Sequence, residues 1–189
     1  MKKKAAFFFD GQNLFHCAKE AFGYEFPNYD PLKLAEKICE LKDWSLGGVR
    51  FYTGVPEEKD HYFMHYFWSQ KIRRMKRQGL ITFTRPIRHG KEKGIDIRIA
   101  LDMVRMARHD NFDVVVVFSQ DQDLSEAVDE VKDIARLNGK PIHIASVYPL
   151  SGGSKNRRGI NHTEWIPVDK TIYDACIDHN EYRPSPKPK

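Results

Sequence analysis

Short apolar runs alternate along the chain with longer amphipathic stretches. The short runs predict strands at residues 5–9, 49–53, 80–84, 113–118 and 141–145. The longer stretches predict helices that begin at residue 30, run from 56 to about 78, run from 96 to about 108, and run from 124 to 137. Strands that alternate with helices in this way indicate βαβ units and a parallel sheet.

The composition of the strands predicts their order. The runs 5–9 and 114–118 are apolar throughout, as expected for central strands that helices cover on both faces. The run 80–84 alternates apolar and threonine residues, which suits an edge strand. We therefore expect an α/β fold with one doubly wound, mainly parallel five-stranded sheet in the order 3-2-1-4-5 and helices on both faces.

The length of 189 residues suits one main domain. We expect this domain to cover residues 1–150. Residues 151–183 are expected to form a C-terminal extension that packs on it, in which 160–168 could add a small edge strand. The Pro/Lys-rich residues 184–189 are expected to be a disordered tail.

Aspartates follow the predicted strands where those strands end. Asp10 comes directly after the first strand, Asp121 and Asp123 follow the fourth, and Asp96 lies beyond the third, at the start of a helix. Each could be a helix cap, a role that aspartate often fills. However, the carboxyl ends of parallel strands meet at one edge of a sheet, and carboxylates gathered there repel each other unless a cation compensates them. Oxygen ligands favour Mg²⁺ or Mn²⁺, and such an ion supports hydrolysis of a phosphodiester.

Two polar residues beside these aspartates are candidates for binding a substrate. Asn13 lies three residues after Asp10, and the hydroxyl of Ser119 could bond a phosphate or a carboxylate. Capping or turn stabilisation is the alternative role for both. Asp102 is expected to pair with Arg98 or Arg105 instead of joining the site, because it faces away from Asp96 on the helix.

Three segments taken together resemble a known family. They are Asp10-Gly11-Gln12-Asn13, Lys93-Gly94-Ile95-Asp96 and Ser119-Gln120-Asp121-Gln122-Asp123, and over about residues 4 to 147 the chain resembles the NYN domain, specifically the LabA-like branch of the PIN-like nucleases. The resemblance implies a PIN-like fold and metal-dependent ribonuclease activity. It also implies that Asp10, Asp96, Asp121 and Asp123 are catalytic, metal-binding acids and that Asn13 matches the asparagine of the family.

Basic residues concentrate in one part of a chain whose net charge is +5. Residues 71–93 contain nine lysines and arginines against one acid, Glu92, so the rest of the chain is slightly acidic. Such a segment indicates a surface that meets phosphates. The candidates for binding an RNA backbone are Arg73, Arg74, Arg77, Arg85, Arg88, Lys91 and Lys93.

Part of this basic segment has another explanation. Arg73, Arg74 and Arg77 fall in the last turns of a predicted helix, where cations complement the dipole on a solvated face. Residues 85–93 lie in a loop, which that explanation does not cover. The aromatic residues in 62–68 are expected to be mostly core, with one or two free to stack on unpaired bases.

Several other classes of protein are disfavoured. Three widely spaced cysteines without a CxxC pattern suggest neither disulfides nor zinc, and only five apolar residues follow the basic start, which is too few for a signal peptide. A haloacid-dehalogenase-like phosphohydrolase needs an acid where Gln12 stands, and a receiver domain needs one where Thr84-Arg85-Pro86 stands. We therefore expect a cytoplasmic endoribonuclease that acts on RNA, has no membrane partner and could form a homo-oligomer, the alternative being an RNA-binding or regulatory module without catalysis.

Overall fold

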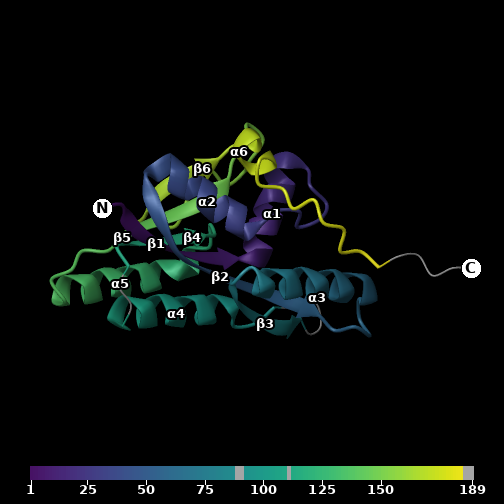
Figure 1. Cartoon of the computed structure of the whole chain (residues 1–189), viewed down its shortest axis with the longest axis horizontal. Helices are drawn as coiled ribbons and strands as arrows, with labels where there is room; N and C mark the ends of the chain where they lie inside the picture. Colours follow the sequence, from purple (N-terminus) through teal and green to yellow (C-terminus); the bar gives the residue numbers. More distant parts are fainter. Residues whose placement is uncertain (88–91, 110–111, 185–189) are drawn as a thin grey trace, which may run out of the picture.

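The fold is a single parallel sheet covered by helices on both faces (Figure 1). The structure is a computed structural model that describes residues 1–87, 92–109 and 112–184. Its strands are β1 (Lys3–Asp10), β2 (Trp44–Pro56), β3 (Ile81–Ile87), β4 (Val114–Phe118), β5 (His143–Pro149) and β6 (Glu164–Val168), in the order β3-β2-β1-β4-β5-β6. The predicted fold class and the order of the first five strands are confirmed, and β6 adds a sixth strand in parallel beside β5.

The helices form two layers. The helices α1 (Gly11–Phe22), α2 (Pro31–Lys42), α3 (Tyr62–Arg77) and α6 (Lys170–Asp174) pack on one face, and α4 (Ile95–His109) and α5 (Ser125–Leu137) pack on the other. Figure 1 shows α1, α2 and α6 above the sheet and α4 and α5 below it. A short 3₁₀ turn, η1 (Gln122–Leu124), joins β4 to α5.

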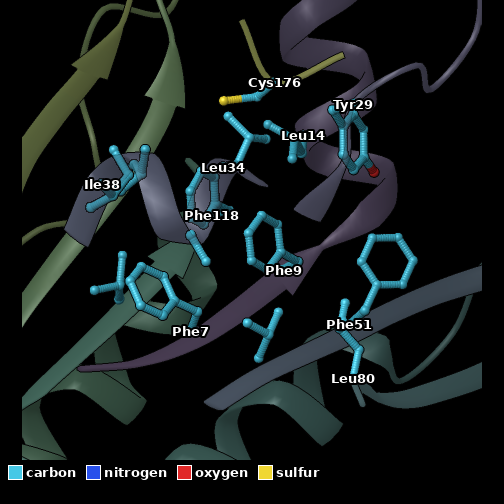
Figure 2. Packing of buried hydrophobic residues seen from close by; sticks show 14 of the residues in the cluster. Phe7, Phe9, Leu14, Tyr29, Leu34, Ile38, Phe51, Leu80, Phe118 and Cys176 are labelled. Carbon is cyan, nitrogen blue, oxygen red and sulfur yellow. The ribbon is translucent and has the colours of Figure 1, made fainter. Parts of the chain in front are cut away.

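The phenylalanines of β1 supply the centre of both cores. Phe7 and Phe9 point to the face covered by α1, α2 and α3, where the Phe9 ring stacks on Phe118 with the centroids 4.0 Å apart (Figure 2). Phe8 points to the other face and stacks on Tyr52. Because side chains alternate between the faces of a strand, this continuous apolar run is what a central strand requires.

Some predicted boundaries are wrong. The helix predicted from Pro56 begins only at Tyr62, because β2 continues to Pro56 in register with Ile87 of β3, and His61 caps the helix by accepting the N–H of Met64. A proline can end a strand beside an edge because its missing N–H is not needed there. The helix α1 directly after Asp10 was not predicted as a separate element.

Residues beyond Pro149 contribute to the same body. β6 extends the sheet, the ring of Tyr173 in α6 is buried in the core of the upper layer, and Tyr29 forms an antiparallel bridge with Ile177. The division into a domain and an extension stays a prediction, and residues 185–189 of the expected tail lie outside the described residues. Of the helices described, none has both the length and the apolar character that crossing a membrane requires.

Candidate functional site

Asp10 is fixed at the carboxyl edge of the sheet by the turn that follows it. It is the last residue of β1 and caps α1, since its Oδ1 accepts the N–H of Asn13 at 3.1 Å. Gly11 lets this turn lie against β2, because a Cβ there would be 2.6 Å from the ring of Phe51 and 3.0 Å from the carbonyl of Tyr52. The capping role and a role in the site therefore occur in the same residue.

Four acids line one cleft of about 490 Å³ at this edge, which we call the acidic cleft: Asp10, Glu92, Asp96 and Asp121. Asp10 comes from β1, Asp96 from the first turn of α4, and Asp121 from the loop after β4, where its side chain caps η1. The structure thus brings together three of the four predicted metal-binding acids. The fourth, Asp123, is exposed and lies outside the lining of the cleft.

The carboxyl group of Asp10 is buried and has no cationic partner among residues 1–87, 92–109 and 112–184. Its residue is only 7% exposed, and burial raises its pKa to about 6. The hydrogen bonds from Asn13 and Ser119 lower this pKa, whereas the charges of Asp121 and Asp96 raise it. An ionised Asp10 would therefore be stabilised by a positive charge bound in the acidic cleft.

Glu92 is the residue of the cleft that the sequence did not identify. Its Oε1 is buried without a hydrogen-bond partner among the described residues, and its side chain packs on Gly54, where a Cβ would lie 3.0 Å from the Cδ of Glu92. Burial and the nearby charge of Asp10 raise the pKa of Glu92 to about 7, against a hydrogen bond from the amide of Gly54. The signal in the sequence was that Glu92 is the single acid within the basic segment 71–93.

Ser119 and Asn13 form hydrogen bonds between the segments that carry the acids of the cleft. Ser119 is 1% exposed, donates a weak hydrogen bond of 3.4 Å to Oδ2 of Asp10, and accepts the N–H of Asp121 at 3.1 Å. The Oδ1 of Asn13 accepts the N–H of Gln120 at 3.0 Å. Neither residue is among those that line the cleft. Their contacts fit the alternative roles, a bond to a carboxylate for Ser119 and stabilisation of the turn for Asn13. Contact of either residue with a substrate stays a prediction.

Asp102 belongs to a separate cluster, as predicted. Its carboxylate pairs with Arg98 at 2.9 Å and with Arg105 at 3.2 Å, and it also accepts the hydroxyl of Tyr52 at 3.0 Å. Because these partners balance its charge, Asp102 differs from the four acids of the cleft, which form no ion pair among the described residues.

The donor set fits a hard divalent ion. Among the residues that the structure describes, no group of three or more His, Cys, Asp and Glu side chains is arranged to hold a metal ion by itself. The acidic cleft nevertheless offers carboxylate oxygens, and burial together with the neighbouring acids raises the pKa of two of its acids, Asp10 and Glu92. Mg²⁺ commonly uses one or two carboxylates and completes its shell with water and substrate phosphates, so a protein need not supply a closed cage.

The predicted basic residues fall in different places. Lys93 lines the acidic cleft, and Arg73 and Arg85 line a second cavity between α3 and β3. Arg74 is half-buried and Arg77 is exposed near the end of α3. The predictions for Arg88 and Lys91 lie outside the described residues.

One member of the basic segment is not a surface cation. Lys71 is 1% exposed, and its ammonium donates to the carbonyl of Tyr29 at 2.8 Å and pairs with Asp178 at 3.1 Å. Counting Lys71 toward a phosphate-binding surface is therefore wrong, because Asp178, 107 residues away along the chain, already holds it inside the protein.

A parallel sheet with uncompensated acids at its carboxyl edge is the arrangement expected of a PIN-like nuclease. A family model described as NYN domain matches residues 4–149, so the chain belongs to the NYN domain family of PIN-like nucleases. A search of curated proteins found no significant match to the chain. The assignment to the LabA-like branch stays a prediction.

Proposed function

We propose that this protein is a metal-dependent ribonuclease that hydrolyses RNA phosphodiester bonds at the acidic cleft. The observation that carries the proposal is the placement of Asp10 and Glu92 beside Asp96 and Asp121 in a member of a nuclease family. Both Asp10 and Glu92 have raised pKa values, and neither forms an ion pair within the part of the chain that the structure describes. Buried charges that serve stability are normally paired, so this arrangement favours a role in binding a cation.

Each acid has a defined part in this proposal. Asp10, Asp96 and Asp121 would hold Mg²⁺ or Mn²⁺, and Glu92 would add negative charge on the β2 side of the cleft. When bound, such an ion acidifies a water molecule and neutralises the charge that builds on the phosphate. Ser119 and Asn13 keep the acids of two strands in register through their hydrogen bonds. Asp123, which is exposed outside the cleft, would influence the ion only at longer range.

The same edge of the sheet offers cations for the RNA backbone. Lys93 lines the acidic cleft, and the guanidinium of Arg85 lies 3.8 Å from the Cβ position of Gly94, which also lines it. These two cations would orient a phosphate beside the acids, since Lys and Arg neutralise phosphates without reading sequence.

The test is a cleavage assay on labelled RNA and on DNA of the same sequence, with Mg²⁺, with Mn²⁺ and with EDTA. We expect cleavage of RNA that EDTA abolishes and that Asp10→Asn or Asp121→Asn reduces at least about a hundredfold. Asp43→Asn is the matched control, because Asp43 directly precedes β2 at the opposite edge of the sheet and is exposed beside Lys2. Asparagine is also tolerated at its left-handed backbone conformation.

Two outcomes would contradict the proposal. Cleavage that Asp121→Asn leaves unchanged would mean that the acids of the cleft are not the catalytic ones. Binding of RNA without cleavage in either metal would instead support the non-catalytic RNA-binding or regulatory module.

A further inference from the structure

A second cavity lies between α3 and the edge strand β3, at the same edge of the sheet as the acidic cleft. Its volume is about 470 Å³, within the range of small-molecule sites. We call it the α3–β3 groove. Its floor contains apolar side chains of β2, α3 and β3, and its polar lining includes Arg73, Lys76 and Arg85.

The three cations of the groove have no acidic partner among the residues that the structure describes. Within the described part of the chain, Arg73, Lys76 and Arg85 form no ion pair, whereas Glu57, an acid of the groove, pairs with Lys59 at 2.9 Å. Arginines on the other face of the sheet, by contrast, have acidic partners. A groove whose cations lack acids is electrostatically complementary to an anionic ligand.

Exposed aromatic rings continue the groove along α3. Tyr62 is 50% exposed and Tyr66 is 36% exposed, and their ring centroids lie 6.3 Å apart. Tyr62, Tyr66 and Arg73 are separated by four and seven positions, so they form one stripe on the helix, about 16 Å long at 1.5 Å per residue. Phe67 and Trp68, on the opposite side of α3, fill the core instead.

The stripe and the acidic cleft are connected through the ends of β2 and β3. Gly54 of β2 pairs in register with Arg85 of β3 and packs against Glu92 of the acidic cleft. Arg85 lines the groove on one side and reaches Gly94 of the cleft on the other. A polymer of phosphates that enters the cleft can therefore continue over Arg85 into the α3–β3 groove.

We propose that the α3–β3 groove, with Tyr62 and Tyr66, is the track on which this chain binds an unpaired stretch of RNA next to the acidic cleft. This inference rests on the proposed function, since it describes how the proposed ribonuclease site binds its RNA substrate. Bases stack on exposed aromatic rings only when they are not buried in a duplex, and phosphates bind the neighbouring cations in any sequence. Exposed rings next to cations favour a single strand over a duplex, which offers only its backbone and grooves.

The test measures binding apart from cleavage. Fluorescence anisotropy in EDTA would follow a fluorescein-labelled 12-nucleotide RNA without self-complementarity, alone and annealed to its complement. We expect the single strand to bind at least about tenfold more tightly than the duplex, and Tyr62→Ala/Tyr66→Ala to weaken only single-strand binding, by about tenfold or more. Tyr62→Phe/Tyr66→Phe keeps the rings and should bind like the wild type.

The salt dependence tests the cations separately. Arg73→Ala should reduce the slope of log affinity against log salt by roughly 0.7, the value for one phosphate of a single strand. Arg136→Ala, an exposed arginine paired with Asp133 on α5 across the sheet, removes the same charge and should leave the slope unchanged.

Equal binding of duplex and single strand, or unchanged binding by Tyr62→Ala/Tyr66→Ala, would overturn this inference. Its failure can be told apart from failure of the proposed function. Tyrosine-dependent binding without cleavage in Mg²⁺ or Mn²⁺ would refute the ribonuclease and leave the groove as a single-strand site. Cleavage that depends on Asp10 but not on the tyrosines would refute the groove alone.

Discussion

Two aspartates of this protein, Asp10 and Asp178, are both removed from water but have opposite electrostatics. Burial raises the pKa of Asp10 to about 6, and the nearby charges of Asp121 and Asp96 add to this increase. Burial would also raise the pKa of Asp178, but the ammonium of Lys71 at 3.1 Å and hydrogen bonds from Asn180 and Tyr182 lower it to about 2. Asp10 lies near two other acids, whereas Asp178 has Lys71 and its hydrogen bonds, and these different surroundings account for the difference.

The comparison separates a structural region from a functional one. Lys71 of α3 and Asp178 of the C-terminal segment form what we call the Lys71–Asp178 clamp, which fixes that segment to the body of the protein. Burial lowers the pKa of Lys71, which shows that its buried charge is unfavourable by itself. Removing either partner of the pair would therefore destabilise the folded protein. In the clamp the chain supplies one charge of each sign, whereas the acidic cleft gathers four acids with Lys93 as the one cation among the described residues of its lining. The missing positive charge is what a bound ion would provide.

The largest effect is expected from breaking the clamp on one side. Asp178→Ala leaves the ammonium of Lys71 buried without its carboxylate, and we expect the free energy of unfolding to fall by about 3 kcal/mol. Urea denaturation at pH 7 measures this loss. The double variant Lys71→Met/Asp178→Ala removes both charges and should recover most of the stability; a double variant as unstable as Asp178→Ala would refute the clamp.

Removing the charge of Asp10 should increase the stability of the protein, whereas removing the charge of Asp178 should decrease it. Asp10→Asn keeps the acceptor for Asn13 but removes a charge that has no partner, so the folded state should become more stable by about 2 kcal/mol at pH 8. The pKa of Asp10 is raised on folding from 3.8 to about 6, so the cost of its charge is full above pH 6. This gain should therefore decline between pH 6 and pH 4.

Urea denaturation of wild type and Asp10→Asn at pH 4, 6 and 8, without divalent ions, would check this sign. The clamp again provides the contrast. The lowered pKa of Asp178 means that its stabilisation is present above pH 4 and is lost as the pH falls toward 2. A stability of Asp10→Asn that equals or falls below the wild type at pH 8 would show that Asp10 is not an uncompensated charge.

A divalent cation bound in the acidic cleft should stabilise the folded protein, as the ammonium of Lys71 does in the Lys71–Asp178 clamp. At tenfold excess over its dissociation constant, Mn²⁺ should stabilise the wild type by about 1.4 kcal/mol, which corresponds to an increase in Tm of roughly 3–5 °C. Differential scanning calorimetry would measure this shift. Asp121→Asn should lose most of it, and Asp178→Ala should keep it although its Tm is lower. A shift of the same size in Asp121→Asn would place the ion elsewhere.

The sequence predicted those parts of the site that follow directly from a strand. Asp10 and Asp121 were predicted because each comes after a buried apolar strand, and the order of the strands follows from their apolar composition. Asp96 was placed at this edge for a related reason, since it lies in the first turn of the helix after β3. Local pattern and the common edge of parallel strands were sufficient in these cases.

The parts that could not be predicted depend on contacts between distant segments. Lys71 was counted as a surface cation because its partner, Asp178, lies 107 residues further along the chain. Glu92 was missed because its burial depends on the space beside Gly54 at the end of β2. Asp123 is separated from Asp121 by one residue, and only the 3₁₀ turn decides that Asp121 lines the cleft while Asp123 faces solvent.

Glu92 gives the smallest and most specific test of the comparison. Glu92→Gln keeps the shape of the side chain and an acceptor for the amide of Gly54 but removes the charge, so we expect a gain of about 1 kcal/mol at pH 8. The gain should be smaller than for Asp10→Asn because Glu92 is more exposed to solvent screening. Since the pKa of Glu92 is raised from 4.5 to about 7, it should decline from pH 7 to about 4.5.

The control for this last variant is Glu130→Gln, which removes an exposed glutamate that pairs with Arg108 on the surface. Glu130→Gln should change the free energy of unfolding by less than about 0.5 kcal/mol. Unlike the effect of Glu92→Gln, this difference from the wild type should not grow as the pH rises. Saturating Mn²⁺ should reverse the gain of Glu92→Gln, because the ion compensates the wild-type carboxylate that the variant lacks. A gain that persists in Mn²⁺ would mean that Glu92 is buried for structural reasons alone, and the acidic cleft would then consist of the three aspartates.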